Sequence, residues 1–490
     1  MLTLINTNRM MPPIAPVGLD YVAGAAGRAG LEVAVLDLNL AADPDAELAA
    51  HFDKHRPELV GLSFRNVDDC FWPGRAWFVP ELVQIIAKIR ARCDAPIVLG
   101  GVGYSIFARQ LVERTGAEFG VRGDGEKAIV ELVRALRGGR RPGRVPGLVW
   151  WEDGVVRRNP PAWPPTFSVP TGRDAVDNPA YFRRGGQLGV ETRRGCDRQC
   201  AYCADPVAKG PSLRLRDPAE VAVEIESLVS RGIDVLHLCD SEFNVPPDHA
   251  RAVCEELIRR RLGERVRWYA YLAVVPFGAE LAALMRRAGC AGINFTADSA
   301  SPAMLVAYRQ PHRQADLAEA VAACRRHGIA VMLDLLLGGP GETPGSVAET
   351  LDFIRRIDPD CAGAALGVRL YPGTPMARRL AAAVALEEPG AIHRRYEGLI
   401  DLVQPTFYVS PALGEHPARL VRELIAGDPR FFEPADLEAE ATAAAGASYN
   451  YNENRPLVEA IAAGARGAYW DILRRLRLSE PPQRPRPGAG

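Results

Sequence analysis

Short apolar runs alternate with longer segments of helical periodicity over residues 1–137. The runs at 2–6, 32–38, 58–64, 96–101 and 117–121 are typical of strands buried on both faces. Between them, segments such as 17–30 and 80–93 repeat apolar residues at helical spacing. Buried strands separated by helices predict an α/β fold with a parallel, doubly wound, Rossmann-like sheet, whose ligands bind at the carboxyl ends of the strands.

The pattern breaks between residues 138 and 187, where proline and glycine are frequent. The segment 148–158 has the alternation of a hairpin with an Asp153–Gly154 turn. We expect the whole stretch to be a linker that wraps the surface.

Alternation of strands and helices resumes at residue 188, in six consecutive units. The predicted strands are 188–192, 234–238, 266–272, 290–296, 330–337 and 362–370. Six units predict a partial (β/α)6 barrel over 188–383, an open relative of the eight-fold barrel, with functional residues in the loops after the strands. Residues 384–490 are expected to form a mostly helical domain that covers the open side of the barrel and ends in a disordered tail at 480–490.

Composition narrows the class of protein. The chain has 490 residues with a net charge of -1, so no strong field indicates a nucleic-acid or membrane partner. No apolar run approaches the roughly 18 residues of a membrane span, and the amino terminus lacks a signal-peptide pattern. Seven of the ten cysteines are dispersed along the chain, and three lie close together. This pattern is typical of reduced thiols, so we expect a cytoplasmic protein.

The exception is a loop after the first barrel strand, where Cys196, Cys200 and Cys203 are spaced Cys-x3-Cys-x2-Cys. A structural zinc site usually adds a second pair of ligands, whereas Cys239 and His237 each stand alone downstream. A disulfide would leave one thiol over. Three thiolates suit three irons of a 4Fe–4S cluster and leave the fourth iron to a non-protein ligand. A zinc site is the remaining alternative.

With Tyr202 before the last cysteine, this motif resembles that of the radical S-adenosylmethionine enzymes. The resemblance includes the six-unit barrel with the cysteines after its first strand, and covers about residues 188–380. It implies that the open iron binds the amino and carboxylate groups of S-adenosylmethionine. It also implies an electron donor such as flavodoxin or ferredoxin.

The same resemblance indicates further contacts to S-adenosylmethionine in the loops after other barrel strands. The candidates are Tyr202, Asp240, Glu242, Asp298, Ser299, Arg313, Gly338, Gly339, Gly341 and Glu342. Glycines let the backbone approach a ligand closely. The competing interpretation is local: the carboxylates cap helices, and "GGPGET" is a strand–helix junction capped by Thr343 or Glu342.

A doubly wound domain ahead of such a barrel resembles the cobalamin-binding members of the superfamily. The resemblance implies a corrin on the strand ends, facing the barrel mouth, with its nucleotide tail beside "GGVGYS" and "GDGE". The implied contacts are Val17, Gly18, Arg65, Asn66, Gly100, Gly101, Gly103, Ser105, Gly123, Gly125 and Glu126. A dinucleotide is not expected, because no G-x-G-x-x-G follows the first strand.

One feature departs from many cobalamin domains, whose Asp-x-His-x-x-Gly motif supplies a histidine ligand to cobalt. This chain has no histidine between His55 and His237. Arg65, after the third strand, would instead point at the lower face of the corrin. A guanidinium has no lone pair to donate, so cobalt would keep low coordination and transfer a methyl cation readily. The alternative is an ion pair between Arg65 and Asp68 or Asp69.

The predicted function is a cobalamin-dependent radical S-adenosylmethionine methyltransferase acting on a carbon of a small molecule. In the family, methyl passes from S-adenosylmethionine through methylcobalamin to the substrate. A variant without a 5′-deoxyadenosyl radical methylates an sp2 carbon, as the tryptophan C2 methyltransferases do, and Tyr308 would then take the indole proton unless it is simply packed in a helix. The alternatives are ring contraction or cyclisation with the same cofactors, or a non-catalytic iron–sulfur or cobalamin sensor.

Overall fold

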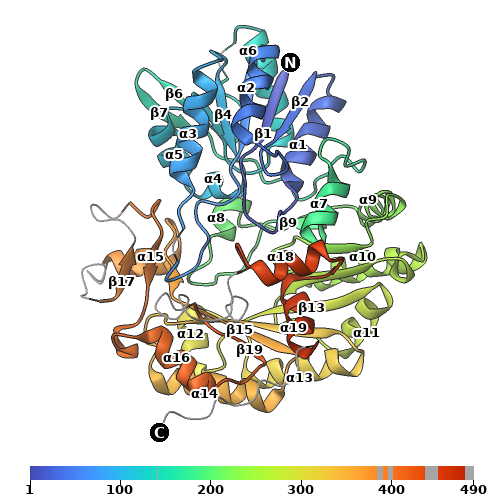
Figure 1. Ribbon diagram of the computed structural model, residues 1–490, viewed down its shortest axis with the longest axis vertical. Coiled ribbons are helices and arrows are strands. Elements are labelled where there is room, and N and C mark those ends of the chain that lie inside the picture. Colours follow the sequence, from blue (N-terminus) through green and yellow to red (C-terminus); the bar gives the residue numbers. More distant parts are fainter. Residues whose placement is uncertain (75, 141, 383–389, 395–400, 436–450, 480–490) are drawn as a thin grey trace.

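The computed structural model describes residues 1–74, 76–140, 142–382, 390–394, 401–435 and 451–479. They form two stacked lobes, the amino-terminal sheet above and the barrel below (Figure 1). The carboxy-terminal helix α18 lies where the two lobes meet.

The upper lobe is a seven-stranded sheet in the order β2-β1-β3-β4-β5-β6-β7, of which the first five strands are parallel. This is the predicted doubly wound order, and an apolar cluster lies on each face of the sheet. Its strands are β1 (Leu2–Asn6), β2 (Val33–Asp37), β3 (Leu59–Ser63), β4 (Ile97–Gly100), β5 (Phe119–Val121), β6 (Leu148–Glu152) and β7 (Val155–Arg158). Its helices are α1 (Val17–Arg28), α2 (Pro44–Lys54), α3 (Val79–Arg90), α4 (Val102–Ile106), α5 (Ala108–Thr115) and α6 (Glu126–Arg137).

The hairpin predicted within the linker is present as β6 and β7. It pairs antiparallel with β5 and therefore extends the sheet of the upper lobe. The chain after it carries α7 (Asn178–Gly185) and enters the lower lobe.

The lower lobe is a parallel sheet in the order β19-β15-β14-β13-β12-β11-β8, in which the six predicted strands follow one another in sequence. The strands are β8 (Leu188–Val190), β11 (Val235–Leu238), β12 (Arg267–Leu272), β13 (Cys290–Asp298), β14 (Ala330–Leu337), β15 (Cys361–Leu366) and β19 (Phe431–Phe432). Its helices include α8 (Asp205–Lys209), α9 (Pro218–Ser230), α10 (Pro247–Arg259), α11 (Ala279–Arg287), α12 (Pro302–Tyr308), α13 (Gln314–Arg326) and α14 (Pro344–Ile357), with the 3-10 turn η1 (Leu262–Glu264).

Smaller elements complete this lobe. They are the two-stranded pair β9 (Arg193–Arg194) and β10 (Arg214–Leu215), and the three-stranded sheet β16 (Val368–Arg369), β17 (Ile392–Arg394) and β18 (Thr406–Tyr408). The remaining helices are α15 (Pro375–Ala382), η3 (Pro411–Leu413), α16 (Pro417–Ile425), α18 (Arg455–Ala462) and α19 (Tyr469–Ser479). The carboxy-terminal segment is thus helical, as predicted, and also adds short strands. The tail predicted to be disordered lies outside the described residues.

Successive side chains along the barrel strands alternate between the outer helices and the inner face. Leu236, Trp268 and Val331 pack outward against the surrounding helices. Their neighbours on the opposite face contact α18 and α19 in a second cluster, whose members include Val235, Tyr269, Met332, Cys361, Leu457, Ile461 and Trp470. The carboxy-terminal helices therefore close the inner face of the partial barrel at this level, consistent with the expected cover.

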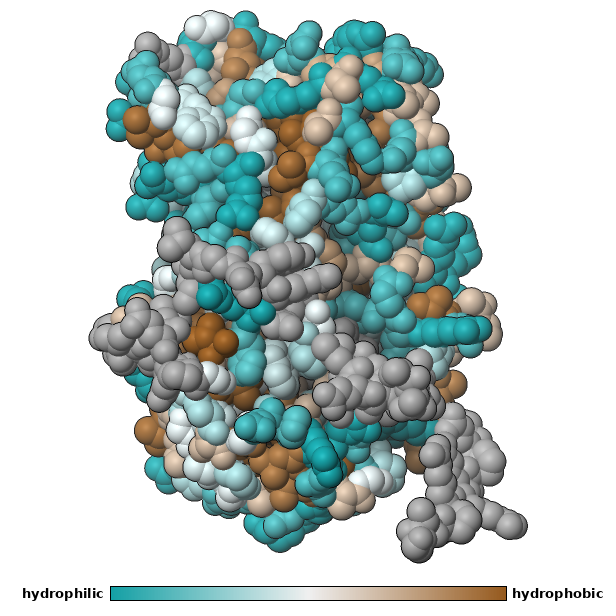
Figure 2. All heavy atoms as spheres, turned by 60° about the vertical axis from the view of Figure 1, so that its left-hand side comes forward, coloured by the Kyte–Doolittle hydropathy of each residue, from teal (hydrophilic) through white to brown (hydrophobic). Residues whose placement is uncertain are grey.

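The outer surface is mixed. On the face shown in Figure 2, hydrophilic side chains separate patches of hydrophobic ones. Within the described residues, no helix has the length and apolar character needed to cross a membrane.

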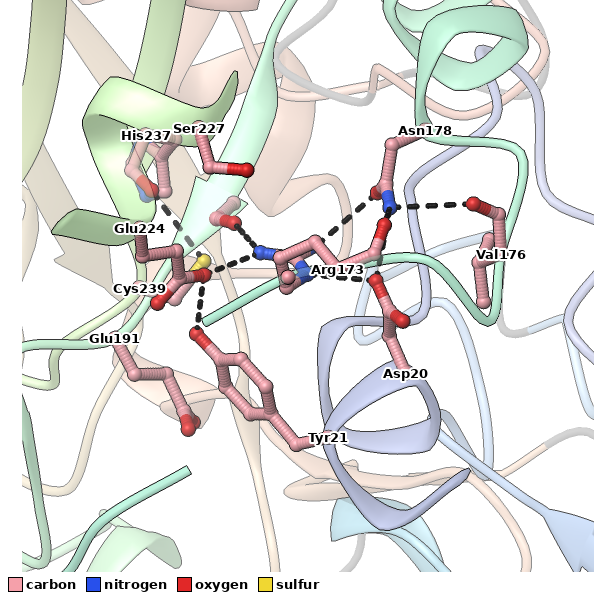
Figure 3. Close-up of polar contacts among 12 residues, drawn as sticks. Asp20, Tyr21, Arg173, Val176, Asn178, Glu191, Glu224, Ser227, His237 and Cys239 are labelled. Carbon is pink, nitrogen blue, oxygen red and sulfur yellow. Dashed lines mark hydrogen bonds and ion pairs between the residues drawn. The ribbon is translucent and has the colours of Figure 1, made fainter. Parts of the chain in front are cut away.

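A buried ionic network fixes one lobe on the other (Figure 3). Arg173, from the linker, bonds Asp20 on α1 at 2.6 Å and Glu224 on α9 at 2.7 Å. The Tyr21 hydroxyl donates to Glu224 at 2.8 Å, and Arg216 pairs with the same carboxylate. The arginine and both carboxylates that it pairs with are at most 1% exposed. The network is buried and joins both lobes and the linker.

Because a buried pair that loses one partner leaves an uncompensated charge, Arg173→Met should lower the free energy of unfolding by about 3–5 kcal/mol. Arg157→Met is the matched control, since Arg157 is 53% exposed and pairs with Glu152 across a hairpin surface. That control should change stability by about 1 kcal/mol or less. Urea unfolding of both variants tests the difference, and equal losses would contradict a clamping role for Arg173.

Candidate active site

The cysteine loop leaves the end of β8 and is held there by Asp240, which follows β11. One Asp240 oxygen accepts the backbone N–H groups of Thr192 at 2.8 Å and Arg193 at 3.0 Å, and the other accepts the Thr192 hydroxyl at 2.5 Å. Asp240 is 3% exposed. The sequence predicts Asp240 as a contact to S-adenosylmethionine, but both its oxygens are engaged in positioning this loop.

The three predicted cluster cysteines lie close together. The Cys203 thiol is near enough to both Cys196 and Cys200 for their charges to raise its pKa. Burial raises the pKa of Cys200 to about 12 and that of Cys203 well above the usual value. Cys196 is buried and the other two cysteines are half-buried. Three adjacent thiols with raised pKa values are unfavourable as thiolates unless cations neutralise them, and iron would supply that positive charge.

The donor set therefore fits an iron–sulfur cluster. The Asp205 N–H donates to the Cys203 sulfur at 3.4 Å, and the Gln310 amide to the Cys200 sulfur at 3.5 Å. In the described residues, no group of three or more His, Cys, Asp or Glu side chains is arranged to hold a single metal ion. A cubane differs from such a site because each thiolate binds a different iron.

Tyr202 connects this loop to the end of β13. Its hydroxyl donates to both oxygens of Asp298, at 2.8 and 2.7 Å, and its ring meets Tyr308 edge-on at 5.6 Å. Gln310 also donates to Asp298. Burial raises the pKa of Asp298 to about 7. The predicted pair Tyr202 and Asp298 thus borders the cysteine loop, and Gln310 is a neighbour that sequence reasoning missed.

Glu242 is the predicted acidic residue with an unused oxygen. Its Oε1 accepts the Thr296 hydroxyl at 2.9 Å, whereas Oε2 is buried with no hydrogen-bond partner in the described residues. Burial raises the pKa of Glu242 to about 8. A buried carboxyl oxygen without a partner, close to the cysteines, is suited to a cationic or N–H-bearing ligand, so contact with the methionine amino group stays our prediction.

Other predicted residues after β13 are engaged elsewhere. Ser299 is fully buried and its hydroxyl bonds Thr350 at 2.9 Å. Arg313, predicted as a contact to S-adenosylmethionine, is exposed at the start of α13, and that contact stays a prediction. Its backbone N–H bonds Asp316, which makes this position a helix cap.

Tyr308 packs behind the glycine-rich loop. Its hydroxyl donates to the Leu336 carbonyl at 2.8 Å and accepts the Gly339 N–H at 3.1 Å. A side chain on Gly339 would overlap that hydroxyl. Because Tyr308 is fully buried and its pKa is raised well above the usual value by burial, it is unsuited to accept a proton. The catalytic prediction for Tyr308 is wrong, and the competing prediction of packing is correct.

The rest of "GGPGET" folds back on itself. The Glu342 carboxylate accepts the Gly338 N–H at 3.3 Å, and burial raises its pKa to about 7. Thr343 caps α14 through the Ser346 N–H, as the local interpretation predicts. Gly341, with φ at +91°, faces open space, so the loop retains one free backbone edge for a ligand.

The glycines at the edge of the upper sheet serve two purposes. A side chain on Gly101 or Gly103 would strike the backbone of Phe64 or Arg65, so these glycines allow two loops to approach. Gly100 and Gly18 face open space. A side chain on Gly123 would strike Trp163, and one on Gly125 would press against Val22. Room for a nucleotide tail is therefore offered by some of the predicted glycines and not by all.

The polar residues predicted at this edge contact protein groups. The Ser105 hydroxyl is buried and accepts the Gly123 N–H at 3.1 Å. Glu126 pairs with Arg194 of the barrel lobe at 2.7 Å. Val17 approaches Gly189 at the start of the barrel. The contacts of Glu126 and Val17 join the two lobes around the strand ends, whereas that of Ser105 lies within the upper lobe.

Comparison with known proteins agrees with this arrangement. Residues 7–133 match the B12 binding domain and residues 190–354 the radical SAM superfamily. The tryptophan 2-C-methyltransferase of Streptomyces laurentii is 33% identical over 442 residues, which span 77% of this chain and 74% of that protein. The chain belongs to the cobalamin-dependent radical S-adenosylmethionine methyltransferases.

Solved structures of one member cover nearly the whole chain. The radical S-adenosylmethionine methyltransferase TsrM from Kitasatospora setae, with tryptophan substrate and the analogue aza-SAM bound, has a TM-score of 0.90 and 32% identity over 97% of this chain and 98% of that chain. TsrM with cobalamin and a [4Fe-4S] cluster has a TM-score of 0.88 and 30% identity, covering 97% of both chains. The predicted family, fold class and cofactors are confirmed, and the cyclase and sensor alternatives are not favoured.

In this methyltransferase, Arg65 reaches from the cobalamin domain to the barrel mouth. Burial, with a smaller contribution from the charge of Arg65, lowers the pKa of His237 to about 4, and burial lowers the pKa of Arg65 itself. Among the described residues the Arg65 side chain has no ion pair or hydrogen bond; Asp68 pairs instead with Arg369 at 2.8 Å. The alternative interpretation of Arg65 as an ion-pair partner of Asp68 or Asp69 is therefore wrong. The guanidinium is left available to the cofactor face.

A cluster of polar residues on the inner barrel face, which we call the chamber residues, was missed from the sequence. His237, Tyr271 and Asp334 share the strand face of Val235, Tyr269 and Met332, which contact the carboxy-terminal helices. Tyr271 is 37% exposed although it sits inside the barrel, and His237 meets it edge-on at 5.3 Å. Asn294 donates to Asp334 at 3.2 Å and accepts the Trp470 indole N–H. Polar residues at every second position of apolar strands were the available signal.

Only part of "YNYNEN" lies in the described residues. Tyr451 packs edge-on against Tyr469, and Asn454 caps α18. Tyr451 packs on the inner-face cluster of the barrel, and the Glu453 N–H bonds the Met11 carbonyl of the upper lobe. The segment therefore contacts both lobes.

Proposed function

We propose that this methyltransferase methylates C2 of the indole of tryptophan or of a close tryptophan derivative. The observation that carries the proposal is the likeness, over 97% of this chain, to a structure whose bound substrate is tryptophan. The curated relative from Streptomyces laurentii bears the corresponding activity in its name.

The chamber residues suit an amino-acid substrate with an aromatic side chain. Asp334 offers a carboxylate to an ammonium group, and Tyr271 offers an accessible ring face or edge to an indole. When bound, S-adenosylmethionine and cobalamin supply the methyl group and the cobalt that relays it. We expect the chain to hold them between Arg65, which lies near Tyr271 and Cys239, and the cysteine loop.

The predicted contacts and partners complete the proposal. Cys196, Cys200 and Cys203 hold the cluster, and Glu242 orients S-adenosylmethionine. The electron donor is a flavodoxin or ferredoxin, and the enzyme works in the cytoplasm.

The test compares substrates with the reconstituted holoenzyme under anaerobic conditions. Tryptophan should yield a methylated product whose nuclear magnetic resonance spectrum lacks the C2 proton. 2-Methyltryptophan, blocked at the reacting carbon, should yield none, and tyrosine should yield none. Methylation of 2-methyltryptophan, or failure of tryptophan and its derivatives while another class of molecule reacts, would overturn the substrate assignment.

A further inference from the structure

A cavity of about 470 Å³ lies at the carboxyl ends of β1 and β3. Its wall includes the residues after β1 and after β3, the start of α3 and Glu453 from the carboxy-terminal segment. Carboxyl ends of parallel strands are where doubly wound sheets bind ligands. We call the part of the wall formed by Thr7, Asn8, Asn66 and Asp69 the amide pocket.

Each of two side-chain amides in the amide pocket has one buried atom without a hydrogen-bond partner in the described residues. Asn8 is 8% exposed, and its Oδ1 accepts the Met10 N–H at 3.0 Å, which identifies the other atom as Nδ2. That Nδ2 is buried and has no hydrogen-bond partner within the described chain. The Oδ1 of Asn66 is buried and unpartnered in the same way. Each such group costs about 1–3 kcal/mol unless a ligand or water satisfies it.

A free donor and a free acceptor in one cavity match the hydrogen-bonding pattern of a primary amide, whose carbonyl accepts and whose NH2 donates. The corrin of cobalamin carries primary carboxamides around its rim. We propose that the amide pocket binds one of these corrin carboxamides and thereby selects cobalamin over corrinoids hydrolysed at that side chain.

The charges around the pocket support this selectivity. A carboxylate in place of the carboxamide has no proton to give to the Asn66 Oδ1. It would also lie near Asp69, which is 8% exposed, and Glu453. Two cations line the cavity. Arg9 is paired with Glu81 at 2.8 Å. Arg65 is the residue predicted to face cobalt beneath the corrin rather than a carboxamide at its rim. The inference rests on the cobalamin dependence of the family and not on the proposed substrate.

The test measures binding of cobalamin and of its separate monocarboxylic acid isomers to the cluster-containing apoprotein, by the visible spectrum of the bound corrinoid. One isomer should bind at least about tenfold more weakly than cobalamin, the effect of about one lost hydrogen bond. Asn66→Ala should remove most of this discrimination, because it removes the Oδ1 acceptor that a carboxamide can satisfy and a carboxylate cannot. Asn8→Asp, which keeps the acceptor for Met10, should weaken cobalamin binding.

Gln84→Ala is the matched control, since Gln84 is exposed on α3 beside the cavity. This variant should bind every corrinoid as the wild type does. Iron content and circular dichroism verify that each variant is folded. Equal affinity of the wild type for cobalamin and all the monocarboxylic acids would overturn the inference while leaving cobalamin dependence intact. Failure of the wild type to bind cobalamin at all would instead contradict its assigned cofactor.

Discussion

Replacing Cys203 with alanine should give a folded protein that binds cobalamin, holds no complete 4Fe–4S cluster and transfers no methyl group. The cubane needs three thiolates from the chain. Cys196 lies near enough to add to the raised pKa of Cys200, and both lie near enough to add to that of Cys203. Iron and sulfide analysis, cobalamin binding and product formation measure the three expected outcomes. Activity should fall by more than about a thousandfold, the effect of about 4 kcal/mol on the barrier.

Cys70→Ala is the control, because Cys70 is an exposed cysteine on the loop after β3 and contacts Tyr371. It should keep wild-type iron content. A Cys203→Ala protein with full cluster content would exclude Cys203 as a ligand. Loss of the cluster from Cys70→Ala as well would show that the assay reports general instability.

Arg65→His should slow methyl transfer by about tenfold or more, the effect of about 1.4 kcal/mol on the barrier. Arg65 has no ion pair among the described residues and cannot donate a lone pair to cobalt. A neutral imidazole at that position offers a lone pair, so cobalt should gain a lower ligand and hold the methyl group more firmly. The visible spectrum of bound cobalamin should shift with the change in coordination.

Arg65→Lys separates charge from ligation. A protonated lysine keeps the positive charge and has no lone pair. We expect its cobalamin spectrum to match that of the wild type and its activity to exceed that of Arg65→His. An Arg65→His enzyme with an unchanged spectrum and wild-type activity would contradict the idea that Arg65 controls the lower face.

The periodicity of apolar residues was sufficient to predict most of the fold. Buried strands such as β1 and β14 coincide with their predicted ranges, because fully buried parallel strands have uninterrupted apolar sequences. The cysteine motif was equally informative, since its ligands are adjacent in sequence. The two-residue β19 was not predicted, because it is too short to have a period.

Single polar residues were predicted less well, because their roles depend on partners distant in sequence. Asp240 binds a loop that precedes it by almost fifty residues, and Tyr308 satisfies a backbone N–H at Gly339. Nothing local distinguishes such positioning groups from ligand contacts. Arg173, in a linker, could not be identified as the centre of a buried network until Asp20 and Glu224 were placed beside it.

The most direct test of the whole account follows the methyl group in a single turnover of the anaerobic holoenzyme, using S-adenosylmethionine with a labelled methyl. The account predicts that the label appears on bound cobalamin and moves to tryptophan C2 only when tryptophan is added. Cobalamin-free enzyme should give no labelled product. Labelled tryptophan formed at the full rate without cobalamin would contradict the relay between the two lobes.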